Sequence, residues 1–463
     1  MKAFLNQKQR QEIGFEYVLK QIDVLSVYGQ ELLNTQKVFK DAKKLETEFN
    51  KIAITIKYLN DYEKVFKEAE IYFARIKNID AIVDGLDLIC LDEIEIFEIK
   101  KFVYNIRKLQ TCFKQVSKID ESYIFNDYTK LFEYLDLDNS QMPFFTLYDD
   151  YSAKLKDLRA QLKKAEVKDM IKDQLRAEEQ RVRLEITNYL LKYQTDLKKS
   201  IKQIAYLDLL IAKAKLAKRY NLNKPVIANK MLLEASYNPY VKELVVANGY
   251  DYIPLTIELE RKVQLITGSN MSGKSVTLKN IILNVLCFQY GIYPFAKRAE
   301  LPLVEYIVYL SDELQDVANS LSSFGKEIAV LNETLDFIKN KQGLVVLDEF
   351  ARGTNPIEAK MIVVGLCKYL QNQNIYSILS THLDLDLDID YTHYQVAGLS
   401  NCEASGLSSE DILKVMDYSL MKVDNKTKVP NDAFKVMNFL NLNRELKSII
   451  EKEYEKEIKN GQN

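Results

Sequence analysis

The sequence predicts an α/β domain built on a parallel sheet, preceded by a helical domain. Three short apolar runs, at residues 263–267, 343–347 and 375–380, each lead into polar or charged residues, as strands do at the ligand-binding edge of a parallel sheet. By contrast, residues 1 to about 225 contain few helix breakers and are expected to be mostly helical. The helices therefore come first in the chain and the sheet second.

A long segment of this helical half, from Tyr151 to Lys224, contains no glycine or proline. As one continuous helix it would exceed roughly 100 Å at about 1.5 Å per residue. We therefore predict a hairpin of two long helices that turns near Lys163–Asp173. Basic residues outnumber acidic ones by about two to one here. This excess is compatible with a phosphate-facing stripe or, as we favour, a solvated helix face.

The first apolar run leads into a complete G-x-x-x-x-G-K-S phosphate loop at residues 268–275. Two glycines let backbone N–H groups point at phosphates, Lys274 supplies positive charge, and the Ser275 hydroxyl can hold Mg²⁺. We therefore expect a bound nucleoside triphosphate, ATP, with Mg²⁺. The expected nucleotide-binding residues are Gly268, Ser269, Asn270, Met271, Ser272, Gly273, Lys274, Ser275 and Val276.

Two carboxylates follow the second apolar run. Asp348 at the strand end is expected to bind Mg²⁺ together with Ser275, while Glu349 is placed to polarise the water that attacks the γ-phosphate. The alternative interpretation is that the two acids only cap a strand. We favour the functional interpretation because a phosphate loop precedes them in the chain.

The chain holds only two histidines. His382 follows the third apolar run and is therefore expected at the same sheet edge, in reach of the γ-phosphate, so we assign it with Lys274 and Glu349 to the catalytic group. His393 lies in a polar connection and is expected at the solvated surface.

Two further segments begin helices. Ser322-Ser323-Phe324 precedes a helix with apolar residues at helical spacing, and by itself is an ordinary helix cap with an acid, Glu327, a few residues on. After the acidic pair, Asn355-Pro356 with Glu358 predicts a capping box.

Together these motifs resemble the ATPase domain of the MutS family of mismatch-repair proteins. Asn270-Met271 match its phosphate loop, residues 348–354 (Asp-Glu-x-x-Arg-Gly-Thr) match its acidic motif, and Thr381-His382 match its Thr-His pair. Ser269 and Ser272 depart from the family, which carries a proline and a glycine there.

The resemblance implies a P-loop NTPase of the ABC/MutS type, preceded by an all-α lever domain, that hydrolyses ATP as a homodimer. It also implies that Ser322 and Ser323 contact the nucleotide bound by the other subunit. We expect a helical core and lever domain at 1–225, the ATPase domain at 226–400, and a helical dimerisation segment at 401–463. Closure on ATP and release after hydrolysis would move the lever helices.

Relative to the family, the sequence lacks the mismatch-recognition domain and the clamp inserted between the lever helices. We therefore expect a dimeric conformational switch of the mismatch-repair type without mismatch-reading parts, whose DNA binding is weak and non-specific. The alternative is an ATP-driven remodeller of a protein client, such as a reactivating factor for a cobalamin-dependent aminomutase. An ABC transporter ATPase is disfavoured because no Leu-Ser-Gly-Gly-Gln motif occurs.

Composition sets the remaining expectations. The formal charge of −2 and pI near 6.0 give no overall attraction to nucleic acid. Five cysteines without metal-binding spacing suggest free thiols in a reducing compartment. Neither a signal peptide nor a run of about 18 apolar residues is found, so we expect a cytoplasmic protein that does not bind membranes.

Overall fold

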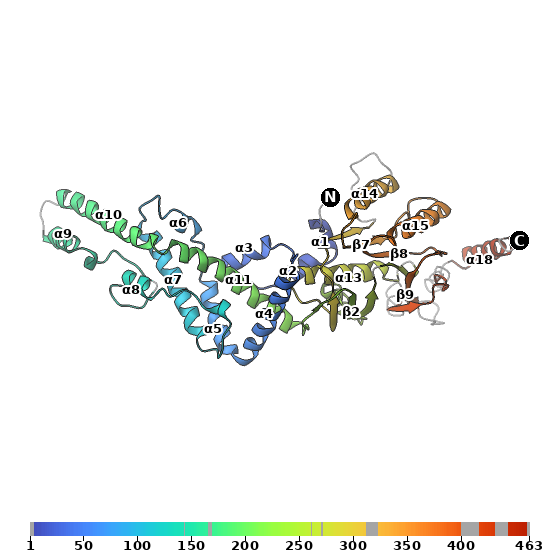
Figure 1. Cartoon of the computed structure of the whole chain (residues 1–463), viewed down its shortest axis with the longest axis horizontal. Coiled ribbons are helices and arrows are strands. Elements are labelled where there is room, and N and C mark those ends of the chain that lie inside the picture. The colour runs from blue at the N-terminus through green and yellow to red at the C-terminus, as the bar shows by residue number, and fades with distance from the viewer. Residues whose placement is uncertain are drawn as a thin grey trace. The chain divides into compact units, whose positions relative to one another are not determined.

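The computed structural model divides the chain into two compact units, which are described separately (Figure 1). One unit comprises residues 1–21, 38–49 and 220–463 and is called the ATPase unit because it contains the segment expected from the sequence to be an ATPase domain; the other, the helical unit, comprises residues 22–37 and 50–219. The structure describes residues 4–142, 144–164, 169–260, 262–269, 272–311, 323–399, 416–430 and 443–460. No helix in these ranges is long and apolar enough to span a membrane.

The helical unit is held together by a long helix, α11, whose buried face packs against α3. The Asp208 carboxylate of α11 accepts hydrogen bonds from the backbone N–H groups of Leu25 and Ser26, which fixes the start of α3. The helices that lie in this unit or enter it are α3 (Val27–Thr35), α4 (Ala42–Asp61), α5 (Glu63–Ala74), α6 (Asp80–Asp84), α7 (Glu93–Phe113), α8 (Thr129–Leu135), α9 (Ala153–Lys164), α10 (Asp169–Leu191) and α11 (Gln194–Arg219), with single 3-10 turns at Glu121–Tyr123 and Asp149–Tyr151.

The predicted hairpin is confirmed in position and wrong in helix number. α9 ends at Lys164 and α10 begins at Asp169, both inside the predicted interval, and the two helices pack against each other. The return is broken again after Leu191, where the Tyr193 N–H bonds to the Leu190 carbonyl before α11 begins. Helical periodicity continues through this break, so the sequence pattern did not show it.

The basic excess of this segment is largely neutralised by acids. Arg159 of α9 contacts the carboxylates of Asp149 and Glu179, at 2.7 and 3.0 Å. Further ion pairs join Lys154 and Arg181 to Glu178, Lys198 to Asp84, Lys215 to Glu70, and Arg219 to Asp23. This pairing agrees with the solvated helix face favoured from the sequence.

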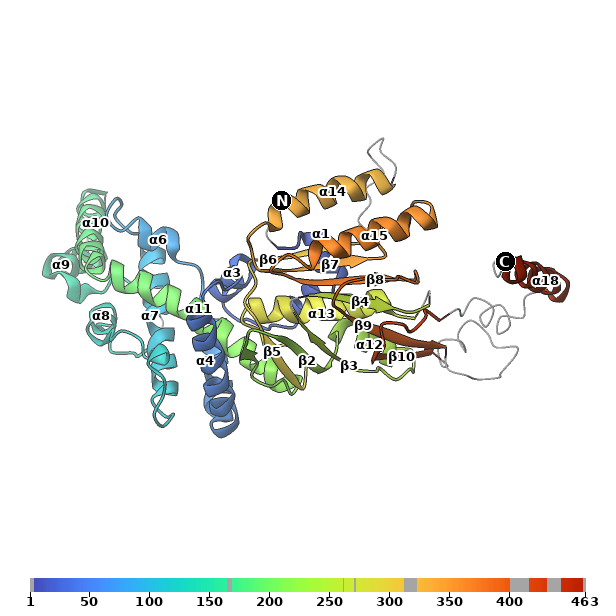
Figure 2. The same ribbon diagram turned by 45° about the vertical axis from the view of Figure 1, so that its right-hand side comes forward.

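The ATPase unit is built on a six-stranded sheet in the order β10-β9-β4-β8-β7-β6, parallel except for β10 (Figure 2). All three strands predicted from apolar runs are present and adjacent. The strands are β4 (Val263–Thr267), β6 (Tyr306–Leu310), β7 (Gly343–Asp348), β8 (Tyr376–Thr381), β9 (Tyr391–Leu399) and β10 (Met416–Val423). Thr267 pairs in register with Thr381, and Asp348 with Ser380, so the carboxyl ends of β4, β8 and β7 form one edge.

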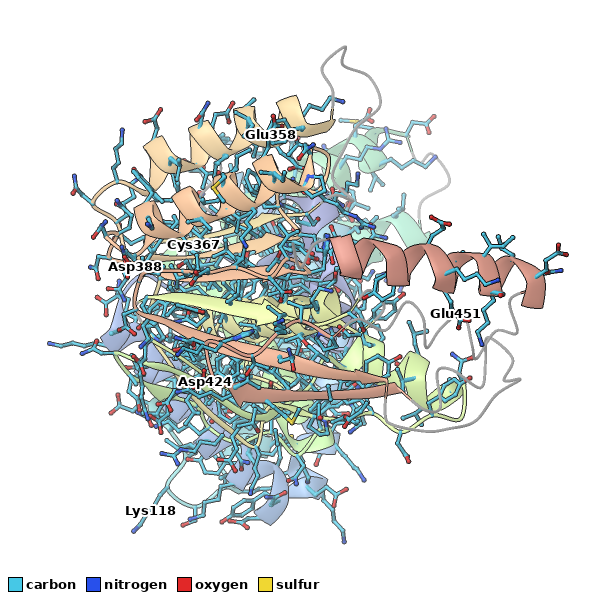
Figure 3. The ribbon with its side chains drawn as sticks, turned by 90° about the vertical axis from the view of Figure 1, so that its right-hand side faces the viewer. Lys118, Glu358, Cys367, Asp388, Asp424 and Glu451 are labelled. Atoms are coloured by element: carbon cyan, nitrogen blue, oxygen red, sulfur yellow. The ribbon has the colours of Figure 1, made fainter. Side chains whose placement is uncertain are left out.

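Helices cover both faces of this sheet. α13 (Lys274–Gln289) lies on one face, while α14 (Ser323–Ile338) and α15 (Pro356–Leu370) lie on the other (Figure 2). Buried side chains of α15, including Val363 and Cys367, pack on Val345 and Leu347 of β7. In Figure 3, Glu358 marks the exposed start of α15 and Cys367 its buried last turn.

A smaller four-stranded sheet lies against the outer side of α13, which also contacts β2. Its strand order is β1-β5-β2-β3, with β1 (Val226–Ile227), β2 (Met231–Ser236), β3 (Leu255–Leu259) and β5 (Arg298–Leu301). In the described part of this unit the remaining helices are α1 (Gln7–Glu12), α2 (Phe15–Lys20), α12 (Pro239–Ala247) and α18 (Arg444–Asn460).

The expected single helical domain over residues 1–225 is divided in the structure. The main division, at Tyr220, is close to the expected boundary, but residues 4–21 and 38–49 belong to the ATPase unit. The ring of Phe15 lies 4.9 Å from that of Tyr290, and the ring of Phe49 lies 5.3 Å from that of Phe288. These early segments cover the apolar end of α13, a contact that helical spacing alone does not predict.

The expected helical segment at 401–463 is also only partly helical. Residues 416–423 form β10, an edge strand hydrogen-bonded to β9. α18 agrees with the predicted charged helix at 443–459. Residues 400–415 and 431–442 lie outside the described part of the chain.

Candidate active site

The phosphate loop connects β4 to α13 through two glycines that no other residue could replace without a shift. At Gly268 (φ +158°) an added Cβ would lie 2.6 Å from Ser272 Oγ, and at Gly273 (φ +92°) it would lie 2.8 Å from the ring of Tyr418. α13 begins at Lys274, directly after the second glycine. Asn270 and Met271, which were expected to bind nucleotide, lie outside the described residues.

Lys274 is held inside this loop. Its Nζ donates hydrogen bonds to the carbonyl oxygens of Gly268 and Ser269, at 2.9 and 3.0 Å, and lies 3.2 Å from Glu349 Oε1. Only 4 % of the residue is exposed. A buried ammonium group is thus positioned by the loop at the sheet edge, where an anionic ligand can meet it.

Two serine hydroxyls of the loop are buried with no hydrogen-bond partner among the described residues. These are Ser269 Oγ and Ser272 Oγ. Leaving a buried hydroxyl unpaired costs on the order of 1–3 kcal/mol, a cost that an oxygen-rich ligand would remove. The donor set of the loop therefore fits a polyphosphate. Val276, on the first turn of α13, is 40 % exposed.

Asp348 ends β7 in a buried position. Its Oδ1 accepts a hydrogen bond of 2.5 Å from Ser380 Oγ of the neighbouring strand β8. Burial raises the pKa of Asp348, while hydrogen bonds from the Ser380 and Ser275 hydroxyls act in the opposite direction. Ser275 and Asp348 are therefore brought together, as predicted for a pair of Mg²⁺ ligands. No cluster of three or more His, Cys, Asp or Glu ligands occurs in the described part of the chain. Mg²⁺ takes one or two protein carboxylates and completes its shell with phosphate and water.

Glu349 follows in a left-handed backbone conformation, with φ +50°. Its N–H donates to the Ser380 hydroxyl at 3.0 Å, which ties the turn to β8. The carboxylate lies 3.2 Å from Lys274 Nζ and 3.1 Å from Arg352 Nη1, and its side chain is 15 % exposed. A non-glycine residue with positive φ is strained, and such strain concentrates at functional sites.

A second left-handed residue, Ala351 (φ +67°), continues this turn. Its N–H donates to the Glu327 carboxylate of α14 at 3.0 Å, so α14 supports the conformation of the acidic turn. The expected capping box of α15 is only half present. Asn355 accepts from the Ile357 N–H, but the Glu358 carboxylate accepts from the Thr354 hydroxyl instead of from the cap backbone.

His382 lies at the same edge, as expected for the residue after β8. Its Nδ1 is 4.0 Å from Glu349 Oε1, which is beyond hydrogen-bond distance, and its side chain is 38 % exposed. A small pocket of about 50 Å³ is lined by Glu349, Arg352 and His382 with their neighbours. A γ-phosphate contact from His382 stays a prediction.

The other histidine, expected at the surface, is buried and bonded to the start of the phosphate loop. His393 is 3 % exposed on β9, its Nε2 lies 2.7 Å from Thr267 Oγ1, and its Nδ1 lies 3.2 Å from the Asp424 carbonyl. Asp424 follows β10 (Figure 3). The acid-rich stretch before residue 391 obscured the alternation of the apolar residues Tyr394 and Val396, from which a strand could have been recognised.

Tyr418 is a second residue that the sequence did not single out. Its ring covers Gly273 of the phosphate loop from β10, and burial raises its pKa. Together with His393 it brings strands β9 and β10 into contact with the loop. The contact of Ser322 and Ser323 with a partner's nucleotide stays a prediction, because Ser322 and the side chain of Ser323 lie outside the described residues.

The thiols take no part in this site. Cys112, Cys287 and Cys367 are buried and free, Cys90 is exposed and free, and Cys402 lies outside the described residues. Burial raises the pKa of Cys367 to about 12. The four described cysteines are free thiols, as expected from the sequence.

The part of the chain that forms this site is similar to a known protein family. Residues 264–430 match MutS domain V. The match begins in β4 and ends after β10, so it contains the phosphate loop, the acidic pair and His382. This part of the chain is therefore similar to a P-loop α/β domain of the MutS type.

Individual relatives agree over a similar region. The chain is 32 % identical over 204 residues to the DNA mismatch repair protein MutS of Carboxydothermus hydrogenoformans, which is 43 % of this chain and 24 % of the relative. It is 29 % identical over 210 residues to MutS of Thermus aquaticus, covering 45 % of this chain and 25 % of the relative. Endonuclease MutS2 of Leuconostoc citreum is 29 % identical over 214 residues, covering 45 % of this chain and 26 % of the relative. The chain thus spans about a quarter of the length of the curated relatives it matches.

Burial of His393 leads to a pH-dependence that can be measured. Burial lowers its pKa below the usual 6.5, while the hydrogen bond to the Asp424 carbonyl acts in the opposite direction. The unfolded chain therefore takes up this proton at a higher pH than the folded chain, so folding stability falls as the pH drops through about 6.5. In urea titrations, the unfolding midpoint of the wild type should be lower at pH 5.5 than at pH 7.5. The variant His393→Gln should show a smaller decrease.

The second histidine provides the control, because these are the only two in the chain. His382→Gln should retain the wild-type pH-dependence. An equal decrease of the unfolding midpoint in the wild type and in His393→Gln would contradict the role assigned to the burial of His393.

Proposed function

We propose that this chain is a MutS-like ATPase that binds ATP with Mg²⁺ and hydrolyses the γ-phosphate. The observation that carries the proposal is the contact between Lys274 and Glu349, which come from motifs about 75 residues apart and meet at the edge formed by β4, β8 and β7. The match of residues 264–430 to MutS domain V supports it independently.

The roles of the residues follow from their chemistry. Lys274 and the loop N–H groups bind the β- and γ-phosphates, and the buried Ser269 and Ser272 hydroxyls gain phosphate oxygens as partners. Ser275 and Asp348 hold Mg²⁺, which when bound neutralises charge on the phosphates. Glu349 orients the attacking water, and His382 contacts the γ-phosphate.

The ion pairs of Glu349 suggest how its activity depends on nucleotide. Lys274 and Arg352 both contact this carboxylate. A triphosphate in the loop competes for the Lys274 ammonium, because a phosphate carries more charge than a carboxylate. Glu349 then loses one of its two cations and becomes available to accept a hydrogen bond from water.

Substitutions at these residues should separate binding from hydrolysis. Glu349→Gln should bind ATP with Mg²⁺ and hydrolyse it about 10²–10⁴ times more slowly, because the carboxylate that orients water is gone. Lys274→Ala should lose ATP binding itself. Binding is measured by titration with a fluorescent ATP analogue and turnover by phosphate release.

Glu358→Gln is the matched control, because Glu358 is an exposed acid of the adjacent helix whose carboxylate accepts only from Thr354 in the described structure. It should keep near-wild-type turnover. Wild-type turnover in Glu349→Gln would exclude Glu349 as the water-orienting group.

We further propose that the protein works as a homodimer with composite sites, in which Ser322 and Ser323 contact the partner's nucleotide. This proposal rests on the resemblance of residues 322–327 to the corresponding MutS segment. The position of Glu327 is compatible with it, since α14 contacts the acidic turn through this residue. Closure of the dimer on ATP would then depend on both subunits.

Mixed dimers test this arrangement. A subunit in which Ser322 and Ser323 are both replaced by bulky residues should inactivate one site of a wild-type partner, while its own phosphate loop still serves the other site. Turnover is measured across a series of mixing ratios. Activity equal to the simple average of the two parent proteins at every ratio would argue against sites shared between subunits.

We propose that the binding partner of this dimer is duplex DNA, bound weakly and without sequence or mismatch specificity. The relatives are named as DNA mismatch repair proteins and an endonuclease of the MutS2 type. Because many cations of α9, α10 and α11 are paired with carboxylates, phosphate attraction from these helices is modest. A protein client, as in the remodeller alternative, is the outcome if DNA does not bind.

Titrations at about 150 mM salt should therefore give the same affinity for a matched duplex and for a duplex with one mispair, with a steep loss of affinity as salt rises. Fluorescence anisotropy with labelled duplexes measures both. A clear preference for the mispair, or ATP turnover stimulated only by mismatched DNA, would refute the absence of mismatch specificity.

A further inference from the structure

The helical unit contains a polar pocket that is independent of the active site. It has a volume of about 420 Å³ and lies along one face of α7, closed by the residues that precede α8 and by the loop at residue 141. This volume lies within the range of small-molecule pockets, but the lining is mainly polar, unlike that of most of them. Its lining residues are Tyr104, Arg107, Lys108, Gln110, Thr111, Lys114, Asp127, Thr129 and Gln141.

Three cations dominate the charge of this pocket. Arg107 and Lys108 lie on α7 and Lys114 caps its end, and none of the three has a carboxylate within 4.0 Å among the described residues. In this they differ from Arg159 of α9 and Arg181 of α10, which form ion pairs. The pocket therefore concentrates positive charge that no direct ion pair in the described part of the chain neutralises, although Lys114 and Arg107 act on Asp127 at longer range.

The single acid of the pocket is already occupied. Asp127 accepts hydrogen bonds from the Thr129 N–H at 2.9 Å and the Thr129 hydroxyl at 2.6 Å, and these bonds lower its pKa. It therefore stays ionised at neutral pH, and the three cations leave the pocket with a net charge of +2. An anionic ligand is favoured over a neutral or cationic one.

Aromatic rings hold two of the cations in place. The Arg107 guanidinium lies 4.3 Å from the centre of the buried Phe132 ring, and Lys108 Nζ lies 5.3 Å from the centre of the Tyr104 ring. Stacking uses the face of a guanidinium and leaves its N–H edge free to donate. Gln110, Thr111 and Gln141 add neutral hydrogen-bonding groups around these cations.

The wall opposite α7 is anchored by a buried ion pair. The Gln141 N–H donates to Asp136 Oδ2 at 3.0 Å, and Asp136 Oδ1 lies 2.8 Å from Lys100 Nζ, with both side chains at most 1 % exposed. Breaking a buried pair of this kind is costly, so the loop that carries Gln141 is fixed relative to α7. The pocket is a built cavity between fixed elements.

We propose that this pocket binds phosphate groups, supplied either by the backbone of a nucleic acid or by a free phosphate ester. Lysine and arginine cations, the arginine able to donate two parallel hydrogen bonds, together with an amide donor such as that of Gln110, are groups that recognise phosphate. Three cations within one short helical face can neutralise adjacent phosphates of one strand. The pocket would then supply localised phosphate contacts, which the ion-paired cations of α9, α10 and α11 do not. Phosphate binding in the pocket does not depend on ATP hydrolysis.

The test uses the full chain carrying Lys274→Ala, so that the phosphate loop does not contribute. Binding is measured with a labelled single-stranded oligonucleotide, with the matching duplex, and with pyrophosphate by calorimetry. Lys108→Gln with Lys114→Gln should weaken binding about tenfold at 50 mM salt and reduce the slope of log K against log salt by about two. Arg107 is left intact because its stacking on Phe132 contributes to packing.

The control is Lys163→Gln with Lys164→Gln, two exposed lysines at the end of α9 that carry the same charge change. Affinity within twofold of the parent is expected for it. Pyrophosphate binding without oligonucleotide binding would identify a free phosphate ester as the ligand, and the reverse would identify a nucleic acid. Equal weakening by both lysine pairs, or no binding of any probe, would refute the pocket as a phosphate site.

The same lysine variants in a chain with an intact phosphate loop separate this proposal from the proposed function. ATP turnover without nucleic acid should be unchanged by Lys108→Gln with Lys114→Gln. Loss of probe binding with normal turnover supports the pocket. Loss of both probe binding and turnover would indicate that the substitutions perturb the fold, which circular dichroism and the midpoint of urea unfolding would then report. In that case the variant Lys108→Arg with Lys114→Arg, which keeps both charges, should restore probe binding. If this variant does not bind the probes, the proposal is refuted.

Discussion

The parallel register of three adjacent strands is the constraint on which the site depends. Thr267 pairs with Thr381 and Asp348 pairs with Ser380, so β4, β8 and β7 end at the same level. Because side chains alternate along a strand, a shift of one residue would turn Asp348 away from Ser380 and bring apolar β7 side chains to the wrong face. The packing of β7 against α15 fixes the register, and the same packing therefore positions the phosphate loop, the acidic pair and His382.

The charged groups at the carboxyl ends of β4, β8 and β7 are neutralised mainly by buried partners. Lys274 is surrounded by two loop carbonyls and the Glu349 carboxylate, and Asp348 by two serine hydroxyls. Such groups lose hydration when the chain folds, and they are tolerated because each is paired. The left-handed turn at Glu349 and Ala351 adds strain that Ser380 and Glu327 offset through backbone hydrogen bonds. Binding groups and strained backbone are thus kept in place by the neighbouring strand and helix.

Local motifs predicted much of this site, while long-range packing was beyond them. The loop at 268–275, Asp348, Glu349 and His382 could be assigned because each follows an apolar run at a fixed spacing. His393 was misplaced because its partner, Thr267, is 126 residues away and the intervening charges suggested a surface loop. For the same reason Phe15 and Phe49 were assigned to the helical domain, although their rings pack on the far end of α13. Spacing identifies a helix or a strand, but which core receives its apolar face depends on contacts between distant segments.

The position of β10 at the edge of the sheet has a consequence for any shortened form of the protein. This strand comes after the last parallel strand of the sheet, yet it pairs with β9 and places Tyr418 over Gly273. Removing it would leave the N–H and C=O groups of β9 unpaired along a new edge, which favours intermolecular strand pairing and aggregation. It would also uncover a glycine whose conformation the ring helps to define. A stable fragment that contains the phosphate loop must therefore extend through residue 430, past the turn at Asp424 whose carbonyl contacts His393.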